Sequence, residues 1–587
     1  MSSIYDKSSL ILIPSGTKTS KVYSQKPVNG DGDFTFSRST AATRVNADGN
    51  IEKETQNLLL QSNSFPTASW DVSSVTLTGS QSGYDGSSDA WKLESNVTNA
   101  NIFQIISTSG VSTFSVYAKA GNASWIRLRY DNTSTTDVNL WCNLTGGSLG
   151  VDNGVSSYTE NIGGGWYRIV VQANTNDLNN LRIYPATSNG GNSNAGDNIY
   201  IQDAQLERGL VARDYIETTT AAVEGGITDN VPRLDYTDSS CPALLLEPQR
   251  LNGLPYSEYF NVWTAINNVS ITANSTTSPE GLKNASLMSV SGAGSFARSV
   301  RQGSQSTNTD KKTMSVFAKA NTANTIQLYH SGDAQGYVNF DLSSGEVGTS
   351  GTNGTGDIEP MENDWYRCIA TFDSVGNFGS SVYVGFATSA SAAYGGGSIS
   401  DTSLSVYIFG AQYEIGSYAT SYIPTYGTSG TRAKDDCTLS DVSNVIADSK
   451  GSFYIEGTLS TMDTSGVIVL TAGANSQDLF FIFVTTAGVL LCEWFDGGTS
   501  QARLQTPTGS ISVGDSFKIA AAYQDNDFVA YWNGTQIGTD SSGTAPTPTL
   551  LRIGKYNVDN YTGGSYTNAM VFKTRLSNEE LAALTTI

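Results

Sequence analysis

The sequence predicts an all-β protein of several domains, and three observations support this prediction. The 587 residues suffice for three or four domains of roughly 150 residues each. Only 15% of the residues are Asp, Glu, Lys or Arg, against about 25% in ordinary soluble proteins, whereas aromatic residues reach 10%. Short runs with a period of two alternate with clusters of Gly, Ser and Asn, and no long run has the helical period. These features are typical of sandwiches and jelly rolls.

An internal repeat predicts that one of these domains is duplicated. Three landmarks return in the same order: FSVYAKA at 114–120 as MSVFAKA at 314–320, WYR at 166–168 and again at 365–367, and IYIQDAQLERG at 199–209 as VYIFGAQYEIG at 406–416. The spacing drifts by a few residues, as loops of different length would cause. We therefore expect two tandem jelly rolls, at 56–220 and 243–430, joined by a linker at 221–242.

The two ends of the chain differ from the repeat. Residues 1–55 contain turn-and-strand patterns, and we expect them to form a separate N-terminal attachment module. Residues 431–587 read as a third sandwich, in which Asn533-Gly534 signals a two-residue type I′ hairpin. Near the end, Ser577 and Glu580 have the spacing of a capping box, which predicts a short terminal helix.

Charge and residue counts exclude several classes of function. The 33 basic and 54 acidic residues give a net charge of −21, which repels nucleic-acid phosphates and anionic membranes, so no nucleic-acid partner is expected. A single histidine, His330, argues against Ser-His-Asp or Cys-His catalysis and against His-rich zinc sites. Five well-separated cysteines argue against a disulfide framework and favour synthesis in a reducing cytoplasm.

No membrane insertion or export signal is expected. The apolar stretch at the N-terminus, 10–13, is too short for a signal peptide. The most apolar stretch, 479–495, is interrupted by Thr485-Thr486-Ala487-Gly488, which is typical of a buried hairpin.

Several phrases resemble those of bacteriophage virion fibre proteins and adhesins: DFTFSR at 33–38, TRVNADG at 43–49, NVPRLDY at 230–236 and CPALLLEPQR at 241–250. The QLERG phrase at 205–209 is similar to the ends of carbohydrate-binding-like jelly rolls. The C-terminal part, with YWNG at 531–534 and RIG at 552–554, resembles the concanavalin A-like, laminin-G-like superfamily. Together these similarities cover nearly the whole chain.

The resemblance implies a structural protein of a head fibre or a tail fibre, made in the cytoplasm of the host bacterium and assembled into the virion. It implies a homotrimer, contacts with other virion proteins of the capsid or tail, and adhesion to cell-surface or environmental glycans through avidity. Two alternatives remain open: a glycan depolymerase of the virion, and a purely structural adaptor or decoration protein. Of these possibilities, adhesion without enzymatic activity is our expectation.

Candidate carbohydrate-binding residues are loop aromatics flanked by amides or acids. Sugars stack their C–H faces on Trp or Tyr, while Asn, Asp and Gln fix the hydroxyl groups. Trp141 with Asn143, and Trp494 with Asp496, fit this pattern. By contrast, we expect the tryptophans at recurring positions in the two copies to lie in the cores: Trp70, Trp166, Trp263 and Trp365.

No cofactor and no catalytic residue is assigned. The metal that the sequence suggests is a structural calcium ion, because Ca²⁺ prefers oxygen ligands and several aspartates occur in Asn- and Gly-rich turns. These are Asp31, Asp33, Asp48, Asp131, Asp525 and Asp527. The same pattern is ordinary turn chemistry, and no EF-hand loop is present. No spaced pair of acids stands out as the pair that glycoside hydrolysis requires.

Overall fold

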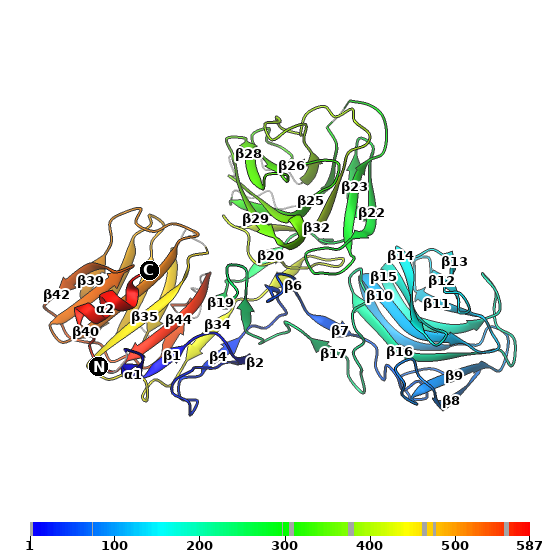
Figure 1. Ribbon diagram of the computed structural model, residues 1–587, viewed down its shortest axis with the longest axis horizontal. Coiled ribbons are helices and arrows are strands. Elements are labelled where there is room, and N and C mark those ends of the chain that lie inside the picture. Colours follow the sequence, from blue (N-terminus) through cyan, green and yellow to red (C-terminus); the bar gives the residue numbers. More distant parts are fainter. Residues whose placement is uncertain are drawn as a thin grey trace.

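The computed structural model describes residues 4–72, 74–295, 297–303, 310–373, 381–460, 466–473, 477–556 and 563–587. Apart from two short α-helices, α1 (Ile4–Lys7) and α2 (Asn578–Thr585), and two 3₁₀ turns, this part of the chain is built from β-strands. Figure 1 shows three lobes, with both termini in the same lobe. The predicted fold class, all-β with several antiparallel sandwiches, is confirmed.

The first jelly roll is one continuous sheet folded around its own core, in the order β13-β12-β11-β15-β10-β16-β9-β8, with β14 on β15. Strands β10 and β15 pair along most of their length, and β10 has register irregularities between Ile105 and Gly110. The strands are β8 (Val75–Gln81), β9 (Ala90–Ser95), β10 (Ile102–Ala120), β11 (Trp125–Asn132), β12 (Val138–Asn143), β13 (Leu149–Asp152), β14 (Ser156–Gly163), β15 (Trp166–Ala186) and β16 (Asn198–Arg208).

The second jelly roll repeats this pairing in two sheets, β21-β24-β31-β26-β27-β28 and β22-β23-β32-β25-β30-β29. Its strands are β21 (Thr264–Ile266), β22 (Val269–Thr276), β23 (Ala285–Val290), β24 (Ser299–Gln302), β25 (Lys312–Ala320), β26 (Thr325–His330), β27 (Tyr337–Asp341), β28 (Glu346–Ser350), β29 (Gly354–Met361), β30 (Trp365–Phe372), β31 (Val382–Phe386) and β32 (Ser405–Ile415). The expected core positions of the recurring tryptophans are confirmed, since all four are at most 4% exposed: Trp70, Trp166, Trp263 and Trp365.

The third sandwich, which we call the base, combines three separate parts of the chain. One sheet contains β1 (Leu10–Leu12), β18 (Arg233–Asp235), β19 (Ala243–Leu246), β35 (Lys450–Thr458), β40 (Ser516–Gln524), β41 (Asp527–Trp532), β42 (Thr535–Asp540) and β44 (Gly564–Phe572). The other contains β2 (Thr17–Lys18), β3 (Lys21–Val22), β4 (Phe34–Ser37), β34 (Asp436–Leu439), β36 (Val467–Ala472), β37 (Leu479–Val484), β38 (Leu490–Asp496), β39 (Thr499–Gln505) and β43 (Leu551–Ile553).

The N-terminal segment and the linker therefore differ from their predicted roles as separate units. Strand β1 pairs with β44, and β4 pairs with β34. On β4, Phe34 and Phe36 alternate with exposed residues and lie fully buried in the base core. On β19, Leu244 and Leu246 lie in the same core and are at most 1% exposed. Apolar faces of short strands need a partner layer, and here the base supplies it.

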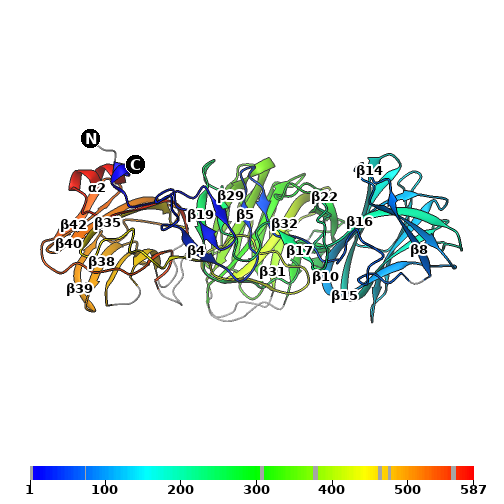
Figure 2. The ribbon, with the colours of Figure 1, turned by 90° about the horizontal axis from the view of Figure 1, so that it is seen from below.

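The two jelly rolls are thus insertions into the base, each closed by a two-stranded neck. The chain enters and leaves the first jelly roll through β7 (Thr55–Asn57) and β17 (Val223–Gly225). It enters and leaves the second through β20 (Arg250–Asn252) and β33 (Gly430–Arg432). Figure 2 shows the resulting row of three lobes.

Two local predictions in the base are confirmed. Ser577 accepts a hydrogen bond from the Glu580 backbone N–H while the Glu580 side chain accepts from the Ser577 backbone, the reciprocal capping box. Asn533 and Gly534 both have positive φ, 46° and 80°, and connect β41 to β42 as a two-residue loop.

A buried ionic network, which we call the hub, joins the three parts of the chain. Arg233 Nη1 lies 2.6 Å from Glu247 Oε2, and Arg38 Nη1 lies 3.1 Å from Asp435 Oδ1. Arg233 also pairs with Asp435, and Arg432 pairs with Glu247. Burial alone would raise the pKa of Glu247, but the neighbouring guanidinium groups hold it well below its usual range.

Candidate functional site

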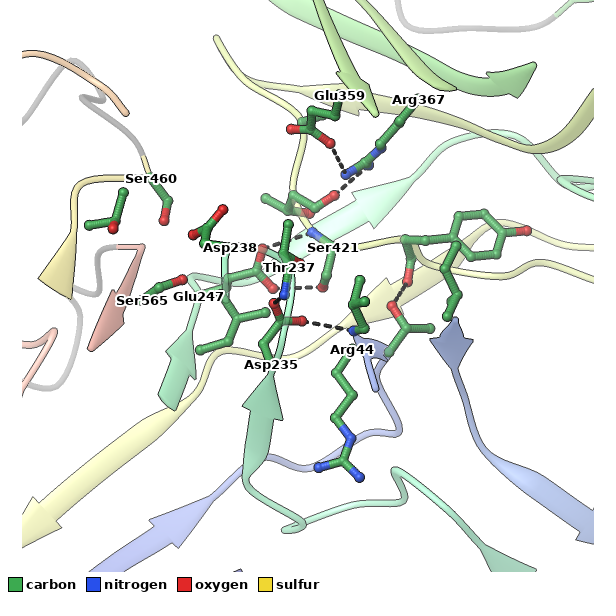
Figure 3. Close-up of a pocket in the computed structure, with 18 of the residues that line it drawn as sticks. Arg44, Asp235, Thr237, Asp238, Glu247, Glu359, Arg367, Ser421, Ser460 and Ser565 are labelled. Carbon is green, nitrogen blue, oxygen red and sulfur yellow. Dashed lines mark hydrogen bonds and ion pairs between the residues drawn. The ribbon is translucent and has the colours of Figure 1, made fainter. Parts of the chain in front are cut away.

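A cavity of about 290 Å³ lies beside the hub, between the second jelly roll and the base. Its walls come from the hairpin β5 (Arg44–Val45) and β6 (Ile51–Glu52), from the segment after β18, from β29 and β30, and from loops of the base. Figure 3 shows the polar side chains that line it. Carboxylates outnumber guanidinium groups in this lining, which contains Arg44, Asp235, Asp238, Glu247, Asp357, Glu359 and Arg367.

Several of these groups already have partners within the protein. Arg367 Nη2 donates to the Thr420 carbonyl at 2.6 Å, and Arg367 Nη1 lies 3.8 Å from Glu359 Oε2. The Asp235 carboxylate accepts from the backbone N–H of Val45 at 2.8 Å and of Thr237 at 3.0 Å. These bonds fix the cavity walls, and the Glu359 side chain, which faces Arg367, is 42% exposed.

The electrostatics of the cavity raise the pKa of two of its carboxyl groups. Burial raises the pKa of Glu359, and the carboxylates of Asp357, Asp238 and Asp235 raise it further against the opposing effect of Arg367. Burial and Asp235 also raise the pKa of Asp238. A raised pKa makes a carboxyl group a better proton donor to a bound ligand than a carboxyl group in water.

The prediction that Trp494 stacks on a sugar is wrong. Its side chain is 0% exposed and packs in the base core against Phe480 and Phe528, at ring-centre distances of 4.9 and 5.5 Å. The alternation of β38 turns Trp494 inward, whereas Phe495 and Asp496 are half-buried. Burial, together with Asp478, raises the pKa of Asp496 at the end of this strand.

Trp141 and Asn143 lie on the outer face of the first jelly roll, on β12. The Asn143 side chain accepts hydrogen bonds from the backbone N–H and the hydroxyl of Thr145, at 2.9 and 2.7 Å, so it stabilises its own turn. Trp141 is 8% exposed, and its indole N–H donates to the Gly191 carbonyl at 2.9 Å. The Trp141 ring is therefore mostly covered, while Trp125, Asn139 and Asn143 on the same face are half-buried.

The main feature of that surface is an arginine held between two rings. Arg127 pairs across the sheet with Trp141 on one side and with Tyr184 on the other. Its guanidinium carbon lies 4.7 Å from each ring centre. Its Nε and Nη2 both donate to Asn139 Oδ1, at 3.0 and 2.7 Å. This arrangement fixes the orientation of a half-buried cation.

A second row on the same face runs across three neighbouring strands. Arg129 of β11 is opposite Arg182 of β15, and Arg182 is opposite Phe103 of β10. The Arg182 guanidinium lies 4.2 Å from the Phe103 ring centre, and Arg129 and Arg182 both pair with Asp131, at 2.7 and 2.9 Å. We call the whole surface the arginine face; it consists of Phe103, Trp125, Arg127, Arg129, Asn139, Trp141, Arg182 and Tyr184.

The sequence prediction missed the arginines of this face. The signal was present in β11, where Trp125, Arg127 and Arg129 alternate with the buried Ile126 and Leu128. Cross-strand neighbours from β15 and β10 are distant in sequence, so only the structure brings them to the same surface.

Within the described residues, no cluster of three or more His, Cys, Asp or Glu side chains could hold a metal ion. Aspartates considered for calcium instead have protein partners: Asp33 lies 3.0 Å from Lys21, and Asp527 lies 2.8 Å from Arg575. The helices of the described ranges are also too short to span a bilayer.

No family model and no curated protein matches this sequence. Solved structures similar to part of it include the Ruminococcus gnavus IT-sialidase CBM40 bound to α2,3-sialyllactose, with 21% identity, 24% of this chain and 84% of that chain covered, and a TM-score of 0.22. The NanB sialidase of Streptococcus pneumoniae shows 16% identity over 25% of this chain and 26% of its own, with a TM-score of 0.22. A SAP-like pentraxin of Limulus polyphemus shows 14% identity, and the match covers 23% of this chain and 70% of the pentraxin chain, with a TM-score of 0.19.

Proposed function

We propose that this chain is a non-enzymatic adhesion protein in which a base sandwich carries two jelly rolls, and that the first jelly roll binds saccharides on its arginine face. The observation that supports this is the row Trp141–Arg127–Tyr184, an ordered cation between aromatic rings on an outer sheet face. Trp141 and Tyr184 are 8% and 4% exposed and hold Arg127 in place, whereas the half-buried Trp125 on the same face offers a ring for the C–H face of a sugar. A fixed polar group beside such a ring suits hydroxyl or acid substituents.

We further propose that the protein belongs to a virion fibre, on the head or the tail, and acts as a homotrimer. The phrases that resemble fibre proteins supply the hub: Arg38 comes from the first, Arg233 from the third and Glu247 from the fourth. These phrases would therefore be retained wherever the same base carries inserted domains. Electron cryomicroscopy of particles tests the setting, because fibre density that fits these three lobes supports it and the absence of the chain from particles overturns it.

The binding proposal is tested with the full chain on a glycan array, followed by titration of the ligands that bind. We expect individually weak affinities that rise with valency, because single sandwich sites gain strength through avidity. Loss of binding in a Trp125→Ala variant that keeps its melting temperature would support the arginine face. A full chain that binds no glycan, even when clustered on a surface, would overturn the proposal.

A second candidate function is glycan hydrolysis in the cavity beside the hub. The observation that favours it is Glu359, an acid with a raised pKa in a cavity that also contains Asp238 and Asp357. Release of reducing ends from a bacterial polysaccharide, abolished in Glu359→Gln and retained in Glu346→Gln, would support it. Glu346 is a matched control because it is exposed on β28 and does not line the cavity.

A further inference from the structure

We propose that the arginine face recognises a saccharide carboxylate through Arg127, and that the second jelly roll has lost this site. This inference rests on the proposed saccharide binding and adds the chemical class of the ligand. It also assigns the two copies of the duplicated domain different tasks.

The first step is the equivalence of positions between the two copies. In the first, Arg127 of β11 pairs with Trp141 and Tyr184. In the second, Gln327 of β26 pairs with Asn339 and Gly385 in the same pattern. The turns at the ends of β12 and β27 support the alignment. Asp341 accepts from the backbone N–H and hydroxyl of Ser343, as Asn143 does from those of Thr145.

The second step is that these equivalent positions differ in chemistry and in access. The three residues that form the cationic row are replaced by two amides and a glycine. Gln327 and Asn339 are 0% exposed, and Gln327 Nε2 donates to Asn339 Oδ1 at 2.8 Å. A loop covers them, because Asn339 Nδ2 donates to the Ala392 carbonyl at 2.7 Å and Gln327 accepts from the Gly395 N–H at 2.7 Å. The corresponding loop also reaches the first copy, where the Trp141 indole N–H donates to the Gly191 carbonyl, but there Arg127 is only half-buried. The second copy therefore lacks the cation, and its equivalent position is fully buried.

The third step is the charge of Arg127. Its neighbours Arg129 and Arg182 are neutralised by aspartates, with Arg129 contacting both Asp131 and Asp137. The ion pairs found among the described residues do not include Arg127, whose hydrogen-bond acceptor is the amide oxygen of Asn139. On a chain with net charge −21, Arg127 is thus a half-buried cation with no ion-pair partner among the described residues, although Asp137 and Asp131 act on it from a longer distance. Such a cation attracts anionic ligands.

The geometry of the Arg127 guanidinium suits a carboxylate ligand. The bonds to Asn139 use Nε and Nη2, so the remaining N–H groups of Arg127 are available at the edge of the face. A planar guanidinium presents paired N–H donors that match the two oxygens of a carboxylate. Trp125, two residues earlier on the same strand and half-buried, lies on the same side and offers a ring for the sugar face.

The test is titration of the immobilised full chain with three matched oligosaccharides: one with a uronic-acid carboxylate, its carboxyl-reduced neutral form, and a sulfated form. We expect the wild type to bind the carboxylate form best. Arg127→Gln, which installs the residue of the second copy, should weaken that binding about tenfold or more and leave the neutral form unchanged. Arg127→Lys should recover part of the loss, because it restores the charge without the paired donors.

Arg503→Gln serves as the charge-matched control, because this side chain is 55% exposed on β39 of the base. It should bind all three compounds as the wild type does, and equal melting temperatures would show that all variants fold. Three results would overturn this inference while leaving saccharide binding intact. The wild type could bind the acidic and neutral forms equally, it could prefer the sulfated form, or Arg127→Gln could bind with full affinity. Failure of the wild type to bind any saccharide would instead overturn the proposed function itself.

Discussion

At the scale of single residues, side-chain direction within a strand decides which aromatic groups can meet a ligand. The sequence prediction chose Trp494 for its acidic neighbours, but the pleat of β38 directs it into the core. The same alternation places Trp141 on an outer face, where its ring is 8% exposed, so sugar binding by Trp141 stays a prediction. Composition around an aromatic residue does not fix its direction, whereas the phase of the buried residues on its strand does.

Replacing Trp494 with Ala should lower the free energy of unfolding of the base by about 3–5 kcal/mol, since it leaves a large cavity in a packed core. Phe495→Ala is the control, one residue further along β38, and removes a half-buried ring from the opposite face of the strand. It should lower the free energy of unfolding clearly less than Trp494→Ala. Urea denaturation of both variants checks this. Equal losses would contradict the assigned phase of β38.

A carboxyl group at the neck of the first jelly roll should make stability depend on pH. Burial and the nearby Glu224 carboxylate raise the pKa of Glu54 to about 7. Because the folded-state pKa exceeds the unfolded value of about 4.3, folding favours the protonated form, and stability falls as pH rises from about 4 to 7.

Glu54→Gln removes this titration. The melting temperature of the variant should therefore exceed that of the wild type by more at pH 8 than at pH 4. Thermal unfolding across this range is the measurement, with Glu346→Gln on exposed β28 as control. A gain that does not change with pH would show that Glu54 does not titrate in this way.

At the scale of elements, close backbone contacts hold the first jelly roll against the segment that follows the second. The Val111 N–H donates to the Tyr426 carbonyl at 2.7 Å, next to the β10 irregularity at Gly110. A Cβ on Gly110 would lie 1.6 Å from that carbonyl oxygen. Glycine is therefore required here by the approach of a second backbone, in addition to its φ of 89°.

Gly110→Ala should separate the first jelly roll from this contact and increase the radius of gyration in small-angle X-ray scattering. Gly86→Ala is the matched control, because Gly86 has a φ of 87° but no atom within 4 Å of its Cβ position. It should carry similar backbone strain and leave the molecular dimensions unchanged. If both variants scatter like the wild type, the contact does not hold the lobes together.

At the scale of the whole molecule, the sequence allowed the fold class and the duplication to be predicted, because both depend on local patterns and on self-similarity. It did not reveal that β1–β4 and β18–β19 complete the base. Such pairings join segments hundreds of residues apart, and period-two patterns do not specify a partner strand. The arginine face was missed for the same reason, since Arg127 and Tyr184 meet only through strand pairing.

The discontinuous base predicts which fragments fold. Residues 431–587 alone lack β4 and β19, which contribute Phe34, Phe36, Leu244 and Leu246 to the core. This fragment should therefore be unfolded or aggregated, with exposed strand edges. The first jelly roll as residues 53–227 contains its own core and neck and should fold alone. Circular dichroism and calorimetry check both, and a cooperative transition in 431–587 would contradict the account of the base.

A crystal structure of the full chain with the tightest glycan found on the array would show directly whether the outer face of the first jelly roll is a saccharide site. We expect the ligand on the arginine face, with an acid group on Arg127 and a sugar ring on Trp125. A ligand bound only in the cavity at Glu359, or only on the second jelly roll, would contradict this expectation.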